Sequence, residues 1–452
     1  MLKPTQSRQA RTLDDLFQGY EGVPFSIRLW NGWQWSSARE QQTAFALVLN
    51  TPAALQALMA EPTELSMGEA FIHGELDIEG DIFSAFSVAE HILTRHRGLR
   101  QQILESVASS LFDLGQWIKR GSEHSLRRDK SSIAHHYDQP IEFYAPWLGE
   151  TLAYSCAYFR SSGDSLEVAQ NQKFELICQK LRLKPLDCML DLGCGWGGLI
   201  LYAAAKYRVL ARGITLSREQ ARLANDRIEQ DNLSQSCAVE LLDYREQARL
   251  GALFDKIASV GMFEHVGVKY LPRYFLTVHR LLKPGGVFLN HGIARSYGSP
   301  PRKSSFIDKY VFPDARLATL SQTLQAAESA GFEVRDVENL REHYELTLRR
   351  WVDGLQRNAD TLLRSVSEVT YRTWLLYMAG SAAAFRRADL GVYQLLLSRH
   401  DRGRSGLPLT RDDWYSDRAS EQQTEFTTSD GGEIRKSVKS RLRRSDSLAG
   451  DS

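Results

Sequence analysis

Two glycine-rich segments carry residue types that could hold a nucleotide-like ligand. The first, DLGCGWGG at 191–198, follows an apolar run and precedes a helical pattern. Glycines at such a turn let the backbone approach a ligand closely, and the start of the next helix presents free N–H groups. Alone, the segment is equally compatible with a plain strand–helix turn or a dinucleotide site. The second segment, GITLSREQ at 213–220, falls where the following strand should end.

The acidic residue before the first glycine, Asp191, and the position of the second segment favour another cofactor. Together these features resemble the S-adenosylmethionine (AdoMet) site of class I methyltransferases. Most of those enzymes end the second strand with an acidic residue that holds the ribose hydroxyls. This chain instead has Thr215-Leu216-Ser217 there, so we expect hydroxyl groups and Gln220 to bind the ribose or the methionine tail.

Further motifs resemble the cyclopropane-fatty-acyl-phospholipid synthase family, in order, over roughly residues 60–400. They are HHYD at 135–138, EFY at 142–144, WL at 147–148, YSCAYF at 154–159, SVGMFEHVG at 259–267, FIDKYVFP at 306–313 and ENLREHY at 338–344. The segment GELDIEGD at 74–81 resembles the N-terminal domain of the phospholipid-acting members, which the related mycolic-acid enzymes lack. The resemblance therefore favours phospholipid acyl chains as the substrate.

The resemblance implies a reaction in which a cis double bond takes the AdoMet methyl group. The resulting carbocation loses a proton and closes to a cyclopropane. Such a reaction needs a positioned sulfonium, a base, and walls that tolerate a cation, a task suited to aromatic faces. In this family a bicarbonate ion serves as the base, and its pocket carries over to Cys156, Glu264, His291, Ile293 and Tyr344. His and Tyr can donate hydrogen bonds to an anion, and a Glu can accept the bicarbonate proton.

The expected cofactor residues carry over from the same resemblance. Arranged by the part of AdoMet that each should meet, they are Tyr154 and Ser155 for the methionine end; Asp191, Gly193, Cys194 and Gly195 for the glycine loop; Thr215, Leu216, Ser217 and Gln220 for the ribose; and Asp243 and Tyr244 for adenine.

Three of these residues also have an ordinary structural interpretation. Cys156 alone reads as a small buried apolar residue, and only its YSCAYF setting reverses this. His291 follows an apolar strand, where a lone histidine is usually a satisfied core residue. Glu264 beside a predicted strand end is the stronger candidate, because a carboxylate is costly to bury without a role. The five cysteines form no CxxC pair and no metal-ligand spacing, so no metal site is predicted.

The same residues leave other functions open. A methyltransferase giving a methyl-branched or methylene product would share the first step and the same side chains. A lipid- or AdoMet-binding regulator on a retired methyltransferase fold is a third possibility, disfavoured because Asp191, Cys156, Glu264, His291 and Tyr344 are all present.

Strand and helix patterns alternate from about residue 187 onward, which predicts a doubly wound, mostly parallel α/β sheet. The resemblance makes this the seven-stranded sheet of class I methyltransferases with helical insertions between 339 and 389. Expected strands lie at 187–192, 209–215, 238–242, 256–260, 287–291, 332–337 and 392–398. Expected helices lie at 199–206, 218–229, 270–282 and 317–329.

A smaller mixed α+β domain is predicted at residues 1–118. Its expected elements are a strand at 25–29, a strand with turns over 68–81, and a helix from about 90 to 114. A basic linker at 119–132 separates it from the catalytic domain at 133–415, and a polar, basic tail follows at 416–452. We expect the tail to be disordered because apolar periodicity vanishes there.

The composition and the apolar segments exclude several other classes of protein. A chain with 43% hydrophobic residues and a net charge of +1 is an ordinary globular protein and no bulk nucleic-acid binder. The N-terminus shows no apolar signal region, and the apolar run at 374–385 is too short to span a bilayer. We therefore expect a cytoplasmic protein, peripheral at the inner face of the membrane. The basic linker and the basic tail are the candidates for contact with the bilayer surface, and a solvated tail without a membrane role is the alternative. Family analogy suggests a homodimer.

Overall fold

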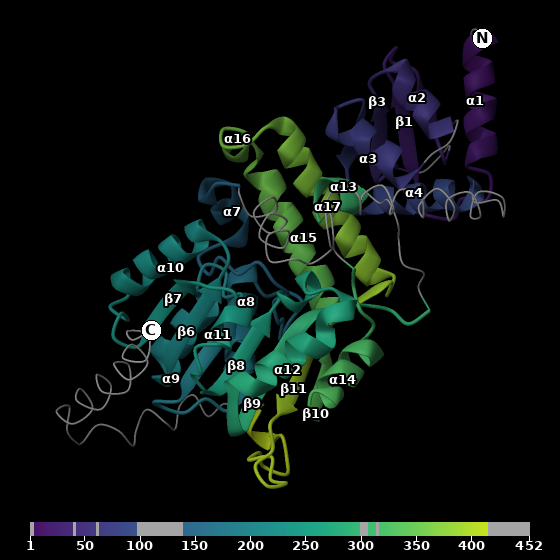
Figure 1. The fold of residues 1–452 in the computed structure, drawn as a ribbon. Helices are drawn as coiled ribbons and strands as arrows, with labels where there is room; N and C mark the ends of the chain where they lie inside the picture. Colours follow the sequence, from purple (N-terminus) through teal and green to yellow (C-terminus); the bar gives the residue numbers. More distant parts are fainter. Residues whose placement is uncertain are drawn as a thin grey trace, which may run out of the picture.

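The computed structural model of this chain describes residues 4–38, 42–59, 63–96, 139–298, 306–312 and 316–414. Within these ranges the strands form one four-stranded and one seven-stranded sheet. Figure 1 shows the small sheet in a separate lobe beside helices α13 (Phe306–Tyr310) and α17 (Glu368–Arg386) of the larger lobe. The predicted basic linker and the predicted tail lie outside the described residues.

The small N-terminal domain has strand order β2-β1-β3-β4. Strands β1 and β3 are parallel, and the other two pairs are antiparallel. The fold confirms the predicted mixed α+β class. The elements of this domain are α1 (Pro4–Leu16), β1 (Phe25–Leu29), β2 (Gln34–Ser36), β3 (Phe45–Leu49), α2 (Pro52–Met59), α3 (Glu64–Ile72), β4 (Leu76–Gly80) and α4 (Ile82–His96).

The prediction of a strand with turns over 68–81 is wrong in its first half. Residues 68–72 end helix α3, and only Leu76–Gly80 is a strand. Helix α3 begins at a capping box, in which Thr63 accepts a hydrogen bond from the Ser66 N–H and the Ser66 hydroxyl accepts one from the Thr63 N–H. Packing against the other domain adds to this, because a Cβ at Gly68 would lie 2.5 Å from the Phe306 ring. The alternating sequence pattern reports neither interaction.

The predicted helix at 90–114 begins earlier than expected, at Ile82. Helix α4 includes the first part of the predicted range, up to His96. The rest of that range, from residue 97 to 114, lies outside the described residues.

The large sheet has strand order β10-β11-β9-β8-β5-β6-β7. Its five strands from β9 to β7 are parallel, whereas β11 runs antiparallel to both β9 and β10. This arrangement confirms the predicted class I methyltransferase sheet. Its strands are β5 (Cys188–Leu192), β6 (Leu210–Thr215), β7 (Cys237–Leu241), β8 (Phe254–Val260), β9 (Leu282–Arg295), β10 (Glu333–Asn339) and β11 (Leu390–Ser398).

Helices cover both faces of the sheet and fill the predicted insertion. Side-chain caps start several of them: Ser165, for example, accepts a hydrogen bond from the Val168 N–H at the start of α8. The helical elements are α7 (Ile141–Leu148), α8 (Leu166–Leu181), α9 (Gly198–Tyr207), α10 (Arg218–Gln230), α11 (Tyr244–Gln247), η1 (Phe263–His265), η2 (Val268–Tyr270), α12 (Leu271–Leu281), α13, α14 (Leu320–Ser329), α15 (Arg341–Arg357), α16 (Ala359–Leu362), α17 and η3 (Asp412–Trp414).

Helix α17 joins the two domains. Arg372 on α17 donates hydrogen bonds to the carbonyls of Phe71, at 2.6 Å, and Leu76, at 2.9 Å, in the N-terminal domain. The guanidinium also lies over the Phe71 ring, with its central carbon 4.4 Å from the ring centroid. No helix within the described ranges is both long enough and apolar enough to cross a membrane.

Candidate functional site

A cavity opens at the carboxyl ends of strands β5, β6 and β8, where ligands bind in sheets of this type. Eleven of the twelve cofactor residues expected from the sequence line it. They are Tyr154, Ser155, Asp191, Gly193, Cys194, Gly195, Thr215, Leu216, Gln220, Asp243 and Tyr244. Residues that are distant in the sequence therefore meet around one space.

The glycine loop after β5 is held in a conformation that only glycine adopts easily. Gly193 has a φ of +77°, and a Cβ there would lie 2.7 Å from Cγ of Met262. The N–H groups of Gly193 and Cys194 both donate to the carbonyl of Ile214 at 3.0 Å, which ties the loop to β6. Another close approach fixes Gly213 on β6, because its Cβ would lie 2.7 Å from Sγ of Cys194. The loop and the neighbouring strand thus determine each other's position.

In the segment after β6, some polar side chains line the cavity and others stabilise the local fold. The Thr215 hydroxyl donates to Oε1 of Gln220 at 2.7 Å and orients that amide at the cavity wall. Ser217 is the one expected cofactor residue that does not line the cavity. Its hydroxyl accepts a hydrogen bond from the Gln220 N–H because Ser217 is the N-cap of α10. We therefore assign Ser217 a structural role.

Asp243 is buried at the cavity wall and is held by its neighbour Arg245. The guanidinium donates to both carboxylate oxygens at 2.8 Å, and the backbone N–H of Arg245 donates to Oδ1 at 2.8 Å. This bidentate contact fixes the carboxylate in one orientation, beside Tyr244, at the place where adenine was expected. Sequence reasoning placed Asp243 there but missed Arg245, which also lines the cavity.

Lys173 on α8 is a cavity residue that sequence reasoning missed. Its side chain is buried, and Nζ donates to the Ser155 hydroxyl at 2.8 Å. Burial lowers the pKa of Lys173 to about 7, although the charges of Cys156 and Asp191 act in the opposite direction. The available sequence signal was a charged residue on the buried face of α8, beside Ala169, Gln170 and Phe174.

Asp191 at the end of β5 lies within the electrostatic reach of that lysine. Burial raises the pKa of Asp191 to about 7, and the Lys173 charge opposes the rise. Its Oδ1 atom is buried without a hydrogen-bond partner among the described residues. A buried, unpaired carboxylate oxygen is costly unless a ligand completes it. Asp191 and Lys173 thus offer one acceptor and one donor to a ligand that carries both charges. Other cavity residues absent from the expected set include Trp196, Met262, His265, Tyr270 and Arg273.

The five residues expected to form the anion pocket lie outside the wall of this cavity. We call Cys156, Glu264, His291, Ile293 and Tyr344 the buried set. As whole residues Cys156, His291 and Tyr344 are buried, and the other two are half-buried. Cys156, Tyr344 and Ile293 share one hydrophobic cluster, and the Cys156 thiol donates to the carbonyl of Ala157 at 3.3 Å. Burial raises the pKa of this thiol well above its usual range, so it stays protonated.

Glu264 and His291 approach this cluster from the short helix η1 and from strand β9. Oε1 of Glu264 accepts a hydrogen bond from the Ile293 N–H at 2.8 Å, at the edge of β9 that β8 no longer covers. His291 lies two residues before Ile293 and therefore on the same face of β9. Nδ1 of His291 lies 3.2 Å from Nε2 of Gln394. The structure thus draws the buried set from four separate segments of the chain.

Both side chains have one buried polar atom with no hydrogen-bond partner among the described residues, namely Oε2 of Glu264 and Nε2 of His291. Burial raises the pKa of Glu264 to about 7, and the hydrogen bond from Ile293 opposes the rise. Burial lowers the pKa of His291 to about 3, and the nearby Lys173 and Lys180 charges lower it further. His291 is therefore neutral at physiological pH, with one donor and one acceptor on its ring.

Aromatic rings connect the cavity to the buried set. Tyr154 lines the cavity, and its ring centroid lies 5.2 Å from that of Trp351 and 5.8 Å from that of Trp374. The Trp351 ring in turn lies 6.0 Å from the Tyr344 ring. Electron-rich faces of this kind stabilise a nearby positive charge and are otherwise apolar enough to accommodate an alkyl chain.

Comparison with known proteins agrees with this geometry. A family profile described as mycolic acid cyclopropane synthetase matches residues 124–395, and a family described only as a domain of unknown function matches residues 12–94. The chain is 37% identical over 399 residues to a probable fatty acid methyltransferase of Pseudomonas putida, covering 87% of this chain and 96% of that protein.

Two further relatives match over a shorter span. The cyclopropane-fatty-acyl-phospholipid synthase of Escherichia coli (strain K12) is 39% identical over 264 residues, covering 58% of this chain and 66% of that protein. The crystal structure of mycolic acid cyclopropane synthase CmaA1 complexed with SAH and CTAB superimposes with a TM-score of 0.56 at 32% identity. It covers 59% of this chain and 97% of that one. The chain belongs to the mycolic acid cyclopropane synthetase family and has the fold of the AdoMet-dependent class I methyltransferases.

Proposed function

We propose that this chain is an AdoMet-dependent C-methyltransferase that modifies the double bond of an unsaturated phospholipid acyl chain and gives a methylene or methyl-branched product. The observation that carries the proposal is the continuity between a polar cavity with the expected cofactor residues and an aromatic wall that leads to the buried set. The relative matched over nearly its whole length, from Pseudomonas putida, is named a probable fatty acid methyltransferase.

The cavity residues fit AdoMet by their chemistry. When bound, this cofactor supplies an electrophilic methyl group. Lys173 would pair with the carboxylate of its methionine end, and the unpaired Oδ1 of Asp191 would accept from its ammonium group. The clamped Asp243 and the oriented Gln220 would meet the adenosine part.

The product must balance in atoms and electrons. Adding a methyl group to one alkene carbon and removing one proton gives a neutral product that is heavier by CH2. A methylene-bearing chain satisfies this balance without another reactant. A saturated methyl branch takes up two further hydrogens and so requires a separate reductant. A cyclopropane has the same composition as the methylene product, and the Escherichia coli relative, a named cyclopropane synthase, makes it the second candidate.

The proton in this scheme needs a base, and the buried set fits a bicarbonate ion in that role. When bound there, bicarbonate supplies a proton-accepting oxygen. The unpaired Oε2 of Glu264 can accept the hydrogen bond of its hydroxyl group, and an N–H at Nε2 of His291 can donate to its negative oxygen. The Ile293 N–H is already used by Glu264, so Ile293 acts here by holding that carboxylate.

Lipid profiling tests the proposal. The full chain would be expressed in a bacterial host that lacks cyclopropane lipids, and extracted phospholipids would be analysed by mass spectrometry and proton NMR. We expect acyl chains heavier by CH2 with vinylic methylene signals, or heavier by CH4 where the host reduces them. Cyclopropane signals would establish the second candidate, and unmodified lipids beside a stably expressed protein would contradict both.

A further inference from the structure

The described residues bury a glutamine against His291 that the cofactor site does not use. Gln394 lies on β11 directly opposite His291 on β9, and its side chain is fully buried. Apart from Tyr393, the neighbouring residues on this strand are apolar: Val392, Leu395, Leu396 and Leu397. An amide in such a strand is costly unless its hydrogen bonds serve a purpose. Its Nε2 lies 3.2 Å from Nδ1 of His291.

This contact determines which ring nitrogen of His291 carries the hydrogen. The Gln394 amide is oriented with its NH2 group toward the ring, and its Oε1 is buried without a hydrogen-bond partner among the described residues. In this orientation the NH2 group donates to Nδ1 of His291, so the ring hydrogen resides on Nε2. Nε2 is buried and has no hydrogen-bond partner within the described part of the chain. The contact therefore turns the far side of the ring into an unused N–H donor.

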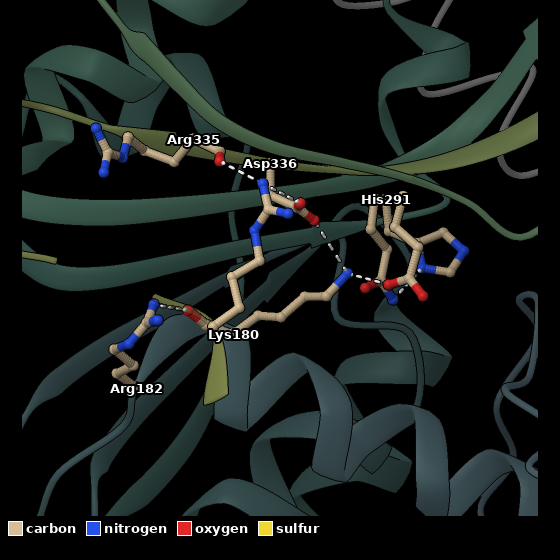
Figure 2. Close-up of polar contacts among 8 residues, drawn as sticks. Lys180, Arg182, His291, Arg335 and Asp336 are labelled. Atoms are coloured by element: carbon tan, nitrogen blue, oxygen red, sulfur yellow. Dashed lines mark hydrogen bonds and ion pairs between the residues drawn. The ribbon is translucent and has the colours of Figure 1, made fainter. Parts of the chain in front are cut away.

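The charged groups around this contact keep the histidine neutral. On the next strand, β10, Glu338 lies directly opposite Gln394. The Glu338 carboxylate is ion-paired with Lys180 of α8. Figure 2 shows the Lys180 side chain reaching toward Asp336, 3.7 Å from its carboxylate, with the His291 ring beyond the end of that side chain. Arg411 binds the other Asp336 oxygen at 3.0 Å. A positive charge near the ring opposes its protonation, so the ring is neutral and exists in one of two tautomers.

We propose that Gln394 is a positioning residue that holds His291 in its Nε2–H tautomer, so that this N–H is presented to the anion that bridges it to Glu264. The inference rests on the proposed function, because the anion is the bicarbonate ion of that scheme. With the opposite tautomer, Nε2 would present a lone pair to the anion and repel it. The Gln394 amide thus favours the tautomer of His291 that can donate a hydrogen bond to the anion.

The test combines ring NMR with turnover on the full-length protein. Histidine labelled with 13C at Cδ2 reports the tautomer through its chemical shift, and the His291 signal is identified by its loss in His291→Asn. We expect the Nε2–H tautomer in the unsubstituted protein. In Gln394→Glu a carboxylate replaces the amide donor, so the ring should move its hydrogen to Nδ1. Gln394→Leu should leave a mixture of both tautomers.

Kinetics separate a positioning role from a packing role. Methyl transfer to oleoyl phospholipid vesicles would be measured against added bicarbonate. The bicarbonate concentration for half-maximal rate should rise about 10–100-fold in Gln394→Glu, the range that loss of a hydrogen bond to a charged group produces. AdoMet affinity by calorimetry should not change. A matched control is Gln247→Leu, which removes another fully buried glutamine, on α11. It should alter neither the ring signal nor the bicarbonate dependence.

Each outcome bears on one claim. An Nδ1–H tautomer in the unsubstituted protein would overturn the inference even if no variant folds. An unchanged ring signal and unchanged bicarbonate dependence in Gln394→Glu would also overturn it. Absence of methyl transfer by the unsubstituted protein would instead contradict the proposed function, while the NMR result would still report the tautomer.

Discussion

The AdoMet cavity and the buried set are neighbours that are built in different ways. Most of the cavity wall comes from loops that follow β5, β6, β7 and β8, each close to a strand end, and the segment before α8 and helix α8 complete it with Ser155 and Lys173. The buried set is drawn from an extended segment, the helix η1, the interior of β9 and the helix α15. Ser155 and Cys156 are adjacent in sequence, yet only Ser155 lines the cavity. Loops after strands supply most of the binding surface, whereas packed elements supply the enclosed side chains of the buried set.

The difference also appears in the electrostatics. In the cavity Lys173 donates to Ser155 and lies within electrostatic reach of Asp191, and Arg245 clamps Asp243, so the cavity charges have counter-charges or donors nearby, even though Oδ1 of Asp191 itself lacks a hydrogen-bond partner among the described residues. In the buried set Glu264 and His291 each keep an unpaired polar atom among the residues that the structure describes. Ligand binding in the cavity should therefore depend on shape and charge pairing. The reaction should depend on the individual unpaired atoms of the buried set. Single substitutions can separate these two dependences.

The largest effect is expected from Gly193→Val in the cavity loop. The substitution forces a β-branched residue to a φ of +77° and places its Cβ 2.7 Å from Met262, so AdoMet binding should be abolished in calorimetry. The control is Gly285→Val, which has the same φ of +77° and no atom within 4 Å of the added Cβ. Tight AdoMet binding by folded Gly193→Val would show that the loop does not contact the cofactor.

The next effect concerns the buried set. Glu264→Gln keeps the shape of the side chain but removes the carboxylate that would accept from the anion. Turnover should fall by roughly 10²–10⁴-fold, the range typical of lost general acid–base groups, whereas AdoMet affinity should remain within error. Glu328→Gln, an exposed position on α14, serves as the matched control. Near-normal turnover in Glu264→Gln would remove this residue from the mechanism.

A smaller effect is expected from Lys173→Met. Loss of a charge-assisted hydrogen bond should weaken AdoMet binding by about 10–100-fold without changing the product. Lys184→Met, at an exposed position after α8, should bind AdoMet normally. If Lys173→Met instead lowers turnover at saturating AdoMet and leaves affinity intact, this lysine belongs functionally to the buried set.

The smallest effect is a pH dependence of stability that originates in His291. Its folded pKa of about 3 lies below the unfolded value of 6.5, so on acidification the unfolded chain takes up the proton first. Stability from this group is nearly complete at pH 7 and decreases by about 2 kcal/mol between pH 7 and 5. Urea unfolding at pH 7 and 5 should show that the free energy of unfolding decreases less between these pH values in His291→Asn than in the unsubstituted protein. His400→Asn, an exposed control, should reproduce the unsubstituted loss.

The sequence predicted the parts of this site that depend on local signals. The glycine loop and the strand ends carry their own motifs, and eleven of twelve expected cofactor residues line the cavity. Ser217, the twelfth, does not line the cavity, and its hydroxyl instead caps helix α10, a role that a hydroxyl before a helix serves equally well. The alternating pattern predicted a mostly parallel α/β sheet and the family resemblance predicted its seven strands, whereas the end of α3 was mistaken for a strand because its helix depends on a capping box and on packing against Phe306.

The contacts that tune the site were beyond sequence reasoning. Lys173 and Gln394 act through partners that only the folded chain brings near, at 18 and 103 residues' separation, whereas Arg245 acts on Asp243 only two residues away. No local motif marks such a residue, apart from a polar side chain on an otherwise buried face. The pKa values of such groups shift because the folded chain buries them and brings other charges near, and no sequence pattern indicates this.

The most direct test of the central claim uses purified full-length protein, AdoMet deuterated in its methyl group, and vesicles of dioleoyl phospholipid. Recovered acyl chains would be analysed by mass spectrometry and NMR. The proposed function predicts chains that gain one carbon with two deuterium atoms, as a vinylic CD2 group, because one deuteron is lost to the base. Acyl chains without deuterium, from protein that binds AdoMet normally, would contradict it.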